Sequence, residues 1–99
     1  MATFTAVVSK SASANITAQN TFTTAVEMTG DFVVRIRGTW SATVTLQRSD
    51  DYGVTFDDVQ TYTANKVDPL YEAELGILYR IGVKTGQFTS GTVAVRLSR

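Results

Sequence analysis

The sequence predicts an all-β protein, a single small antiparallel β-sandwich of jelly-roll or immunoglobulin-like type with about seven to eight strands. Its 99 residues allow one domain, and a chain of this length buries roughly two-thirds of its surface on folding. Hydrophobic residues make up 43% of the chain, which has one Pro and seven Gly. From Thr21 onward apolar and polar residues alternate with a period of two, as in strands with one buried face.

The first 20 residues are predicted to form an N-terminal arm or a partner-dependent strand, and residues 21–99 the β-sandwich. A short strand is expected near Thr3–Ser9. The segment that follows it, SASANITAQN, consists mainly of small and polar residues with few apolar anchors. This composition indicates a linker, or a strand that becomes ordered on a partner.

Two segments in the middle of the chain show the alternation most clearly. In DFVVRIR, one face consists of Phe32, Val34 and Ile36. In WSATVTLQRS, the apolar face consists of Trp40, Ala42, Val44 and Leu46. Because β-branched threonines suit the solvated side of a strand, we expect solvent on the opposite face, which consists of Ser41, Thr43, Thr45 and Gln47.

The later segments are assigned from their turn residues. SDDYG separates WSATVTLQRS from VTFDDVQTYTA, which predicts an antiparallel hairpin. DPLYEAEL is interpreted as a loop or one short turn because its Pro restricts the residue before it. ILYRIGVKT and GTVAVRLSR are predicted to form a second hairpin across GQFTS, with inward positions at Val93, Val95 and Leu97.

The composition argues against several function classes. Nine basic and nine acidic residues cancel, so no overall field favours a nucleic acid or an anionic membrane. No stretch approaches the roughly 20 apolar residues that span a bilayer, and the N-terminus lacks the apolar run of a signal peptide. Cys is absent, which excludes disulfides and thiol chemistry. We therefore expect synthesis in the cytoplasm and neither a nucleic-acid nor a membrane partner.

His is also absent, which removes the usual general base and the partner of a serine nucleophile. The candidate catalytic groups are carboxylates, at Asp50, Asp51, Asp57, Asp58, Glu72 and Glu74. Two of them across a cleft could cleave a glycosidic bond. Most stand in or beside turns, however, where acidic side chains bond to nearby backbone. We therefore predict no catalytic, cofactor-binding or metal-binding residues, with calcium binding by SDDYGVTFDD as an open alternative.

Two sets of exposed side chains are candidate binding residues. Arg35, Arg37, Arg80 and Arg96 occupy polar-face positions. They form either a solvated face with cross-strand partners such as Glu27 or Glu74, or a protein interface, where Arg is enriched. Sugar-stacking platforms could come from Trp40, Tyr62, Tyr71 and Tyr79. Since Trp40 falls on an apolar face, core packing is favoured for it.

A local motif occurs in the acidic turn. Its residues are Ser49, Asp51, Gly53, Thr55 and Phe56. They match the pattern S-x-D-x-G-x-T-[W/F] and resemble the Asp-box, a hairpin motif of sialidases and many unrelated β proteins. The resemblance implies that the Ser and Asp secure the turn, and that the motif itself is seldom catalytic. We expect a positive φ at Gly53 and Phe56 anchored in the core.

The chain from about residue 30 to 99 resembles a group of small β-sandwich proteins encoded among virion genes of tailed bacteriophages. The resemblance is carried by GTWSATVTLQRSDDYGVTFDDVQTYT and LYRIGVKTGQFTSGTVAVRLSR. Phe56 stands where Trp is commoner, and Tyr52 replaces a frequent Gly. The resemblance implies a non-enzymatic virion protein made in the host cytoplasm: a capsid decoration protein, a head spike, or a piece of fibre or collar.

The decoration role carries further expectations. We expect a homotrimer that bridges neighbouring copies of the major capsid protein, or another virion protein, and so cements the head. Its docking residues would lie in Thr3–Gln19. The alternative is a carbohydrate- or receptor-binding module of a head spike, collar or tail fibre, with Tyr52, Tyr71 and Phe88 as the exposed contact residues.

Overall fold

The structure, a computed structural model, describes residues 10–99. The strand expected near Thr3–Ser9 lies outside the described residues. Within that range the chain is all-β, as predicted, and forms nine strands rather than the seven to eight expected. The strands are β1 (Ser11–Ile16), β2 (Thr21–Phe22), β3 (Val26–Glu27), β4 (Gly30–Arg37), β5 (Trp40–Ser49), β6 (Asp57–Tyr62), β7 (Lys66–Glu72), β8 (Leu78–Gly91) and β9 (Val93–Ser98).

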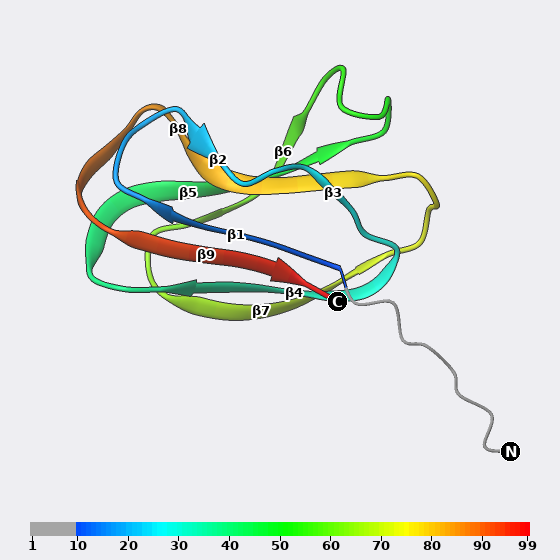
Figure 1. The fold of residues 1–99 in the computed structure, drawn as a ribbon, viewed down its shortest axis with the longest axis horizontal. Coiled ribbons are helices and arrows are strands. Elements are labelled where there is room, and N and C mark those ends of the chain that lie inside the picture. Colours follow the sequence, from blue (N-terminus) through cyan, green and yellow to red (C-terminus); the bar gives the residue numbers. More distant parts are fainter. Residues whose placement is uncertain (1–9) are drawn as a thin grey trace, which may run out of the picture.

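The strands form two antiparallel sheets. The first has the order β1-β9-β4-β7, and the second has the order β2-β8-β5-β6 with β3 also paired to β8. Figure 1 shows the long strands of both sheets aligned roughly along one axis, with the β5–β6 turn projecting from the body. The predicted antiparallel sandwich is therefore confirmed.

The pairing scheme is that of a jelly roll when β2 and β3 count as one interrupted strand. The first strand then pairs with the last (β1·β9), the second with the last but one (β2 and β3·β8), and so on through β4·β7 to β5·β6. Two further pairings, β4·β9 and β5·β8, complete the sheets. Of the two predicted topologies, this is the jelly roll rather than the immunoglobulin-like one.

The core lies between the sheets and follows the predicted alternation. All eight of the following inward positions are buried: Phe32, Val34 and Ile36 of β4, Val44 and Leu46 of β5, and Val93, Val95 and Leu97 of β9. Trp40 and Ala42 pack against the margin of this core and remain partly exposed. Alternation identifies the core because successive strand side chains point to opposite faces.

The Thr-rich face of β5 is solvated as predicted at Ser41 and partly at Thr43, but not farther along the strand. Thr45 and Gln47 are only 1% and 7% exposed. β5 is an interior strand, flanked by β8 and β6, and side chains from neighbouring elements lie over its outer side. The prediction was wrong because composition along one strand does not reveal what covers it.

The predicted second hairpin is also wrong. GQFTS is part of the 14-residue strand β8, and β9 belongs to the other sheet. Gly91 makes the change of sheet possible, since its φ is +89° and a Cβ there would lie 2.3 Å from the Thr39 carbonyl oxygen. Only glycine combines that φ with so close an approach.

The DPLYEAEL segment is a loop only at its end, residues 73–75, because its first five residues belong to the strand β7, Lys66–Glu72. Pro69 is tolerated there because β7 is an edge strand. No strand lies beyond its free edge, so a missing N–H on that edge removes no hydrogen bond of the sheet.

Six residues of the expected 20-residue N-terminal arm are part of the sandwich. Ser11–Ile16 pairs with β9 along its whole length, from Ser11↔Ser98 to Ile16↔Val93. Ile16 is fully buried in the core. These six residues are therefore not a linker, and they form an edge strand of the four-stranded sheet within the chain itself.

Candidate functional site

The acidic turn after β5 is held by its own side chains. Asp51 Oδ1 accepts hydrogen bonds from the Ser49 hydroxyl at 2.7 Å and from the Thr55 backbone N–H at 2.9 Å, and Oδ2 accepts one from the Thr55 hydroxyl. The Gly53 N–H donates to Ser49 Oγ at 2.8 Å. These bonds, first of all those from Thr55, lower the pKa of Asp51 to about 2. The turn-securing roles predicted for Ser49 and Asp51 are confirmed, as is the positive φ of Gly53, +94°.

Phe56 is not the core anchor that the motif led us to expect. It is half-buried on the outer side of the five-stranded sheet, where the Arg80 guanidinium lies 3.9 Å from its ring centre. Phe22 of β2 flanks the same guanidinium at 4.4 Å. The two rings and Arg80 thus form a lid over the outer side of β5.

Polar bonds tie this lid to the sheet. Arg80 Nε donates to Gln47 Oε1 at 2.7 Å, and Gln47 Nε2 donates to Asp58 Oδ1 at 2.8 Å. Lys84 Nζ binds the other oxygen of Asp58 at 2.7 Å. Lys84 and then Gln47 lower the pKa of Asp58. The Asp58 carboxylate therefore has a structural role, because it links Gln47 of β5 to Lys84 of β8.

Glu72 stands at the centre of a second structural network. Its carboxylate accepts hydrogen bonds from Arg48 Nε at 2.6 Å, from the Tyr79 hydroxyl at 2.6 Å and from the Glu74 N–H at 3.0 Å. The Arg48 bond is the main cause that lowers the pKa of Glu72 to about 2, and burial raises that of Tyr79 to about 12. Because Glu72 belongs to β7 while Arg48 and Tyr79 belong to β5 and β8, the network joins the two sheets.

The remaining candidate carboxylates are exposed: Asp50, Asp57 and Glu74. Across residues 10–99, no three acidic side chains gather closely enough to hold a metal ion. Both oxygens of Asp51 are already engaged within the turn. The geometry therefore offers no support for the calcium alternative at SDDYGVTFDD.

The aromatic candidates separate into two groups. Tyr62 and Tyr79 are buried, and the Tyr62 hydroxyl donates to Asp68 at 2.6 Å. Trp40 packs at the core margin and donates from Nε1 to Asn65 at 2.7 Å. Phe88, expected to be an exposed contact residue, also packs against the core. Tyr52 and Tyr71 are well exposed.

Three of the four predicted arginines share one surface. Arg35 and Arg37 of β4 and Arg96 of β9 lie on the outer side of the four-stranded sheet, whereas Arg80 lies on the other sheet. The acidic partners proposed for them are used elsewhere: Glu27 pairs with Lys10 at 3.5 Å, and Glu74 lies 3.7 Å from Arg48. The predicted pairing of these arginines with Glu27 or Glu74 is therefore wrong, whereas Arg37 is solvated as that interpretation expected.

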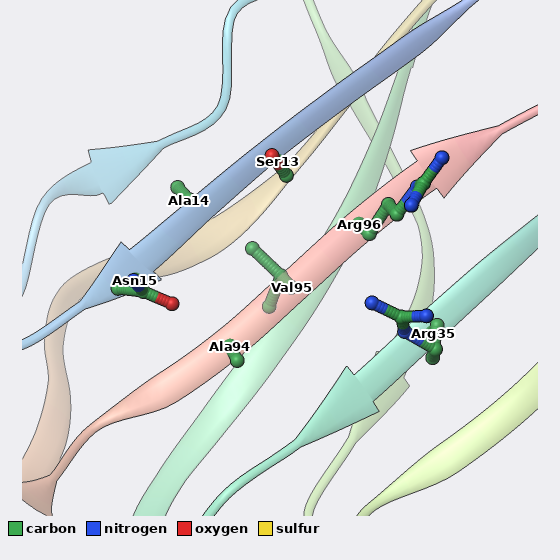
Figure 2. A pocket seen from close by; sticks show the side chains of 7 residues that line it. All are labelled: Ser13, Ala14, Asn15, Arg35, Ala94, Val95 and Arg96. Atoms are coloured by element: carbon green, nitrogen blue, oxygen red, sulfur yellow. The ribbon is translucent and has the colours of Figure 1, made fainter.

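Arg35 and Arg96 are direct register partners across β4 and β9. Ser13 of β1 lies opposite Arg96 on the other side. Together with Asn15 and Ala94 these residues line a shallow depression of about 340 Å³ whose lining contains no acidic residue. Figure 2 shows the two arginines projecting from neighbouring strands on the same side of the sheet.

Apolar side chains continue this surface toward the free edge of the sheet. Val67 is the register partner of Arg35, and Tyr71 is that of Asp31. Val67 and Tyr71 are 60% and 69% exposed. Pro69, also exposed, lies between them on the same side of β7. We call Val67, Pro69 and Tyr71 the β7 strip.

Sequence reasoning missed the β7 strip because 68–75 was interpreted as a loop. The alternation in KVDPLYE carried the signal, with Val67, Pro69 and Tyr71 at every second position, but the Pro outweighed it. The pairing of Arg35 with Arg96 had no local signal, since it depends on the register between β4 and β9.

Comparison with known proteins gave no match, whether to protein-family models, to curated proteins or to solved structures. Residues 10–99 also include no helix of the length and apolarity needed to cross a membrane.

Proposed function

We propose that this chain is a non-enzymatic structural protein of a bacteriophage virion, a capsid decoration protein that attaches through the outer side of its four-stranded sheet. The observation that carries the proposal is the β7 strip beside Arg35 and Arg96. Exposed aliphatic and aromatic side chains bordered by arginine are typical of the centre of a protein interface.

The positions of the carboxylates support an interaction role rather than a catalytic one. Asp51 secures a turn, and Glu72 joins the two sheets. Asp58 binds Gln47 and Lys84 on the outer side of the five-stranded sheet. Each is engaged with groups of its own chain. The jelly roll agrees with the resemblance at the level of fold alone, since viral capsid proteins and lectins both use it.

Attachment would stabilise the particle by mass action. A subunit that bridges neighbouring shell proteins binds the assembled shell and not the dissociated subunits, so it shifts the equilibrium toward the shell. In this proposal the partner is the major capsid protein or another virion protein, and the location is the virion surface.

We propose that the protein acts as a homotrimer, because three small subunits can meet at local threefold points of a capsid lattice. Size-exclusion chromatography with light scattering should give the mass of three chains at micromolar concentration. A monomer under these conditions would contradict the trimer but not attachment by single subunits.

The strip gives a direct test of attachment. Val67→Ser with Tyr71→Ser should abolish co-sedimentation with particles of the phage that carries the gene. The matched control is Val54→Ser with Leu75→Ser, since these residues are 81% and 84% exposed outside the strip. If the strip variant still saturates the particles, the proposed surface is wrong; if the wild-type protein does not bind them, the decoration role is wrong.

The docking arm needs a narrower test than the sequence suggested. Deleting Thr3–Gln19 would remove β1 and the buried Ile16, so loss of attachment could reflect unfolding. A deletion that ends at Ser9 keeps β1. If this shorter chain decorates particles at full occupancy, no docking residue lies before Lys10.

Carbohydrate binding is the second candidate, and Tyr52 is the residue that favours it. It is exposed in the projecting turn and borders a depression also lined by Lys10 and Glu27. An exposed ring beside polar groups can stack on a sugar and hydrogen-bond its hydroxyls. A glycan array should show binding that Tyr52→Ala removes; uniform silence across the array would contradict this candidate.

A further inference from the structure

We propose that Arg35 and Arg96 form a carboxylate-binding site that takes an acidic segment of a partner protein. The inference deepens the proposed function, because it names the chemistry of the partner on the same sheet. It rests on that proposal only for the partner being a virion protein.

The first argument is the register. Arg35 and Arg96 lie directly opposite each other on antiparallel strands, and both are half-buried. Like charges in directly opposed positions destabilise a sheet. Burial adds to the cost, because a partly desolvated guanidinium without a partner loses hydration. An anion between the two would remove both penalties.

The second argument is the contrast with the other half-buried cations of residues 10–99, since the exposed Arg37 and Lys66 need no partner. Lys10, Arg48 and Lys84 each bind a carboxylate. Arg80 bonds to Gln47 and lies between two aromatic rings. Within this part of the chain, neither Arg35 nor Arg96 has a hydrogen bond, ion pair or ring contact. Their donors remain available to a ligand.

The third argument is access. Ser13, Asn15 and Ala94, which surround the pair, are small or short side chains, and the depression they line is open to solvent. Ser13, in register with Arg96, adds a hydroxyl donor to the guanidinium donors. Figure 2 shows that Ser13, Arg96 and Arg35 come from three successive strands, β1, β9 and β4.

Guanidinium forks bind carboxylate and phosphate equally well in geometric terms. The surroundings favour carboxylates of a protein. Val67 lies directly beside Arg35 in register, and Tyr71 extends the apolar surface. A protein segment covers such side chains, whereas a phosphate backbone does not. The zero net charge also gives a polyanion no long-range attraction.

The experiment measures peptide binding to the intact chain by amide chemical shifts at low ionic strength. The probe is a peptide with four consecutive glutamates flanked by leucines, and its control replaces the glutamates with glutamines. We expect shifts at Ser13, Arg35 and Arg96 with the acidic peptide only. Arg35→Gln and Arg96→Gln should each weaken binding about tenfold, as expected for lost charge-assisted hydrogen bonds.

Lys66→Gln is the matched control, since it removes one positive charge from an exposed residue of the same sheet outside the depression. Its affinity should stay within about twofold of the wild type. If Lys66→Gln weakens peptide binding as much as the arginine variants do, the effect is due to net charge and the proposed site is wrong. Melting temperatures close to that of the wild type would show that all three variants are folded.

Each other outcome also decides the proposal. No binding of the acidic peptide at millimolar concentration overturns it. Inorganic phosphate or single-stranded DNA could instead bind more tightly than the peptide, in a manner that depends on Arg35. The claim that the ligand is an acidic protein segment would then be wrong. Concentration-dependent self-association lost in Arg35→Gln makes a second copy the occupant and overturns it as well.

Particle attachment separates this inference from the proposed function. If Arg35→Gln with Arg96→Gln attaches to particles as the wild type does, the site is wrong and the decoration role stands. If the acidic peptide binds through both arginines but particles do not bind, the site stands and the decoration role is wrong.

Discussion

The outer sides of the two sheets treat the same residue type in opposite ways. On the five-stranded sheet, Arg80 is enclosed by Phe22 and Phe56 and bonded to Gln47. On the four-stranded sheet, Arg35 and Arg96 face each other in register without such cover. The Arg80 guanidinium is held by neighbouring side chains, whereas those of Arg35 and Arg96 have no such contacts. The difference teaches that an arginine on a strand is structural or functional according to its neighbours across the sheet.

The largest expected effect comes from displacing β2, whose Phe22 covers the outer side of the five-stranded sheet. A Cβ on Gly82 would lie 2.1 Å from the Thr21 carbonyl oxygen and 2.6 Å from Phe22 Cα. Gly82→Ala should therefore displace β2 and lower the free energy of unfolding by more than about 3 kcal/mol, measured by urea denaturation. The control is Gly86→Ala, where the added Cβ meets nothing and only the φ of +81° is strained. Equal losses would contradict the role of close approach.

The ion pair between Arg48 and the buried Glu72 provides the next measure. Glu72→Gln leaves Arg48 without its carboxylate and should cost about 3 kcal/mol. Glu74→Gln is the control, because Glu74 is exposed and lies 3.7 Å from the same arginine. It should cost less than about 0.5 kcal/mol. A similar loss in both variants would show that the second carboxylate matters as much as the first.

The same carboxylate predicts a pH dependence. The pKa of Glu72 is lowered from 4.5 to about 2 in the folded chain, so its stabilisation is present above pH 4.5 and is lost as the pH falls toward 2. Melting temperatures measured between these values should decline, and Glu72→Gln should decline less steeply. A parallel decline in both chains would assign the acid sensitivity to other groups, such as Asp51 or Asp58.

The two faces can be compared directly with one substitution. Arg80→Met keeps the aliphatic contact with the rings but leaves Gln47 without a donor, and it should cost about 1–2 kcal/mol. Arg35→Met should change stability by less than about 0.5 kcal/mol, or raise it slightly, because it relieves like-charge opposition. Chemical denaturation of both variants measures the contrast. If Arg35→Met costs as much, the two faces are energetically alike.

A further local effect is expected at the turn that projects from the five-stranded sheet. Asp51→Ala removes the acceptor of the Thr55 and Ser49 bonds, so the melting temperature should fall while attachment to particles is kept. Calorimetry and co-sedimentation measure the two readouts. An unchanged melting temperature would mean that the match to the turn motif is accidental.

Local patterns predicted the parts of the fold that depend on neighbours in sequence. The inward positions of β4, β5 and β9 followed from period-two alternation. Ser49, Asp51 and Gly53 followed from turn chemistry, because their bonds span only a few residues. Such contacts are determined by the segment itself.

The predictions that failed depended on distant segments. Gln47 is buried because Arg80 bonds to it from the neighbouring strand, and Phe56 lies against that same arginine. The continuation of β8 through GQFTS depends on its pairing with β5. The sequence identified four arginines as candidates. Only the register between β4 and β9 shows that Arg35 and Arg96 lie opposite each other.

The pairing of the first described strand with the last has a consequence for folding kinetics. β9 lies between β1 and β4, so the four-stranded sheet remains in two pieces until this last strand inserts. Contacts between such distant segments close slowly, on a scale of milliseconds to seconds. Arg35 and Arg96 come together in that same step. The proposed carboxylate-binding site would therefore form only when folding is complete, and an acidic ligand would select fully folded chains over partly folded ones.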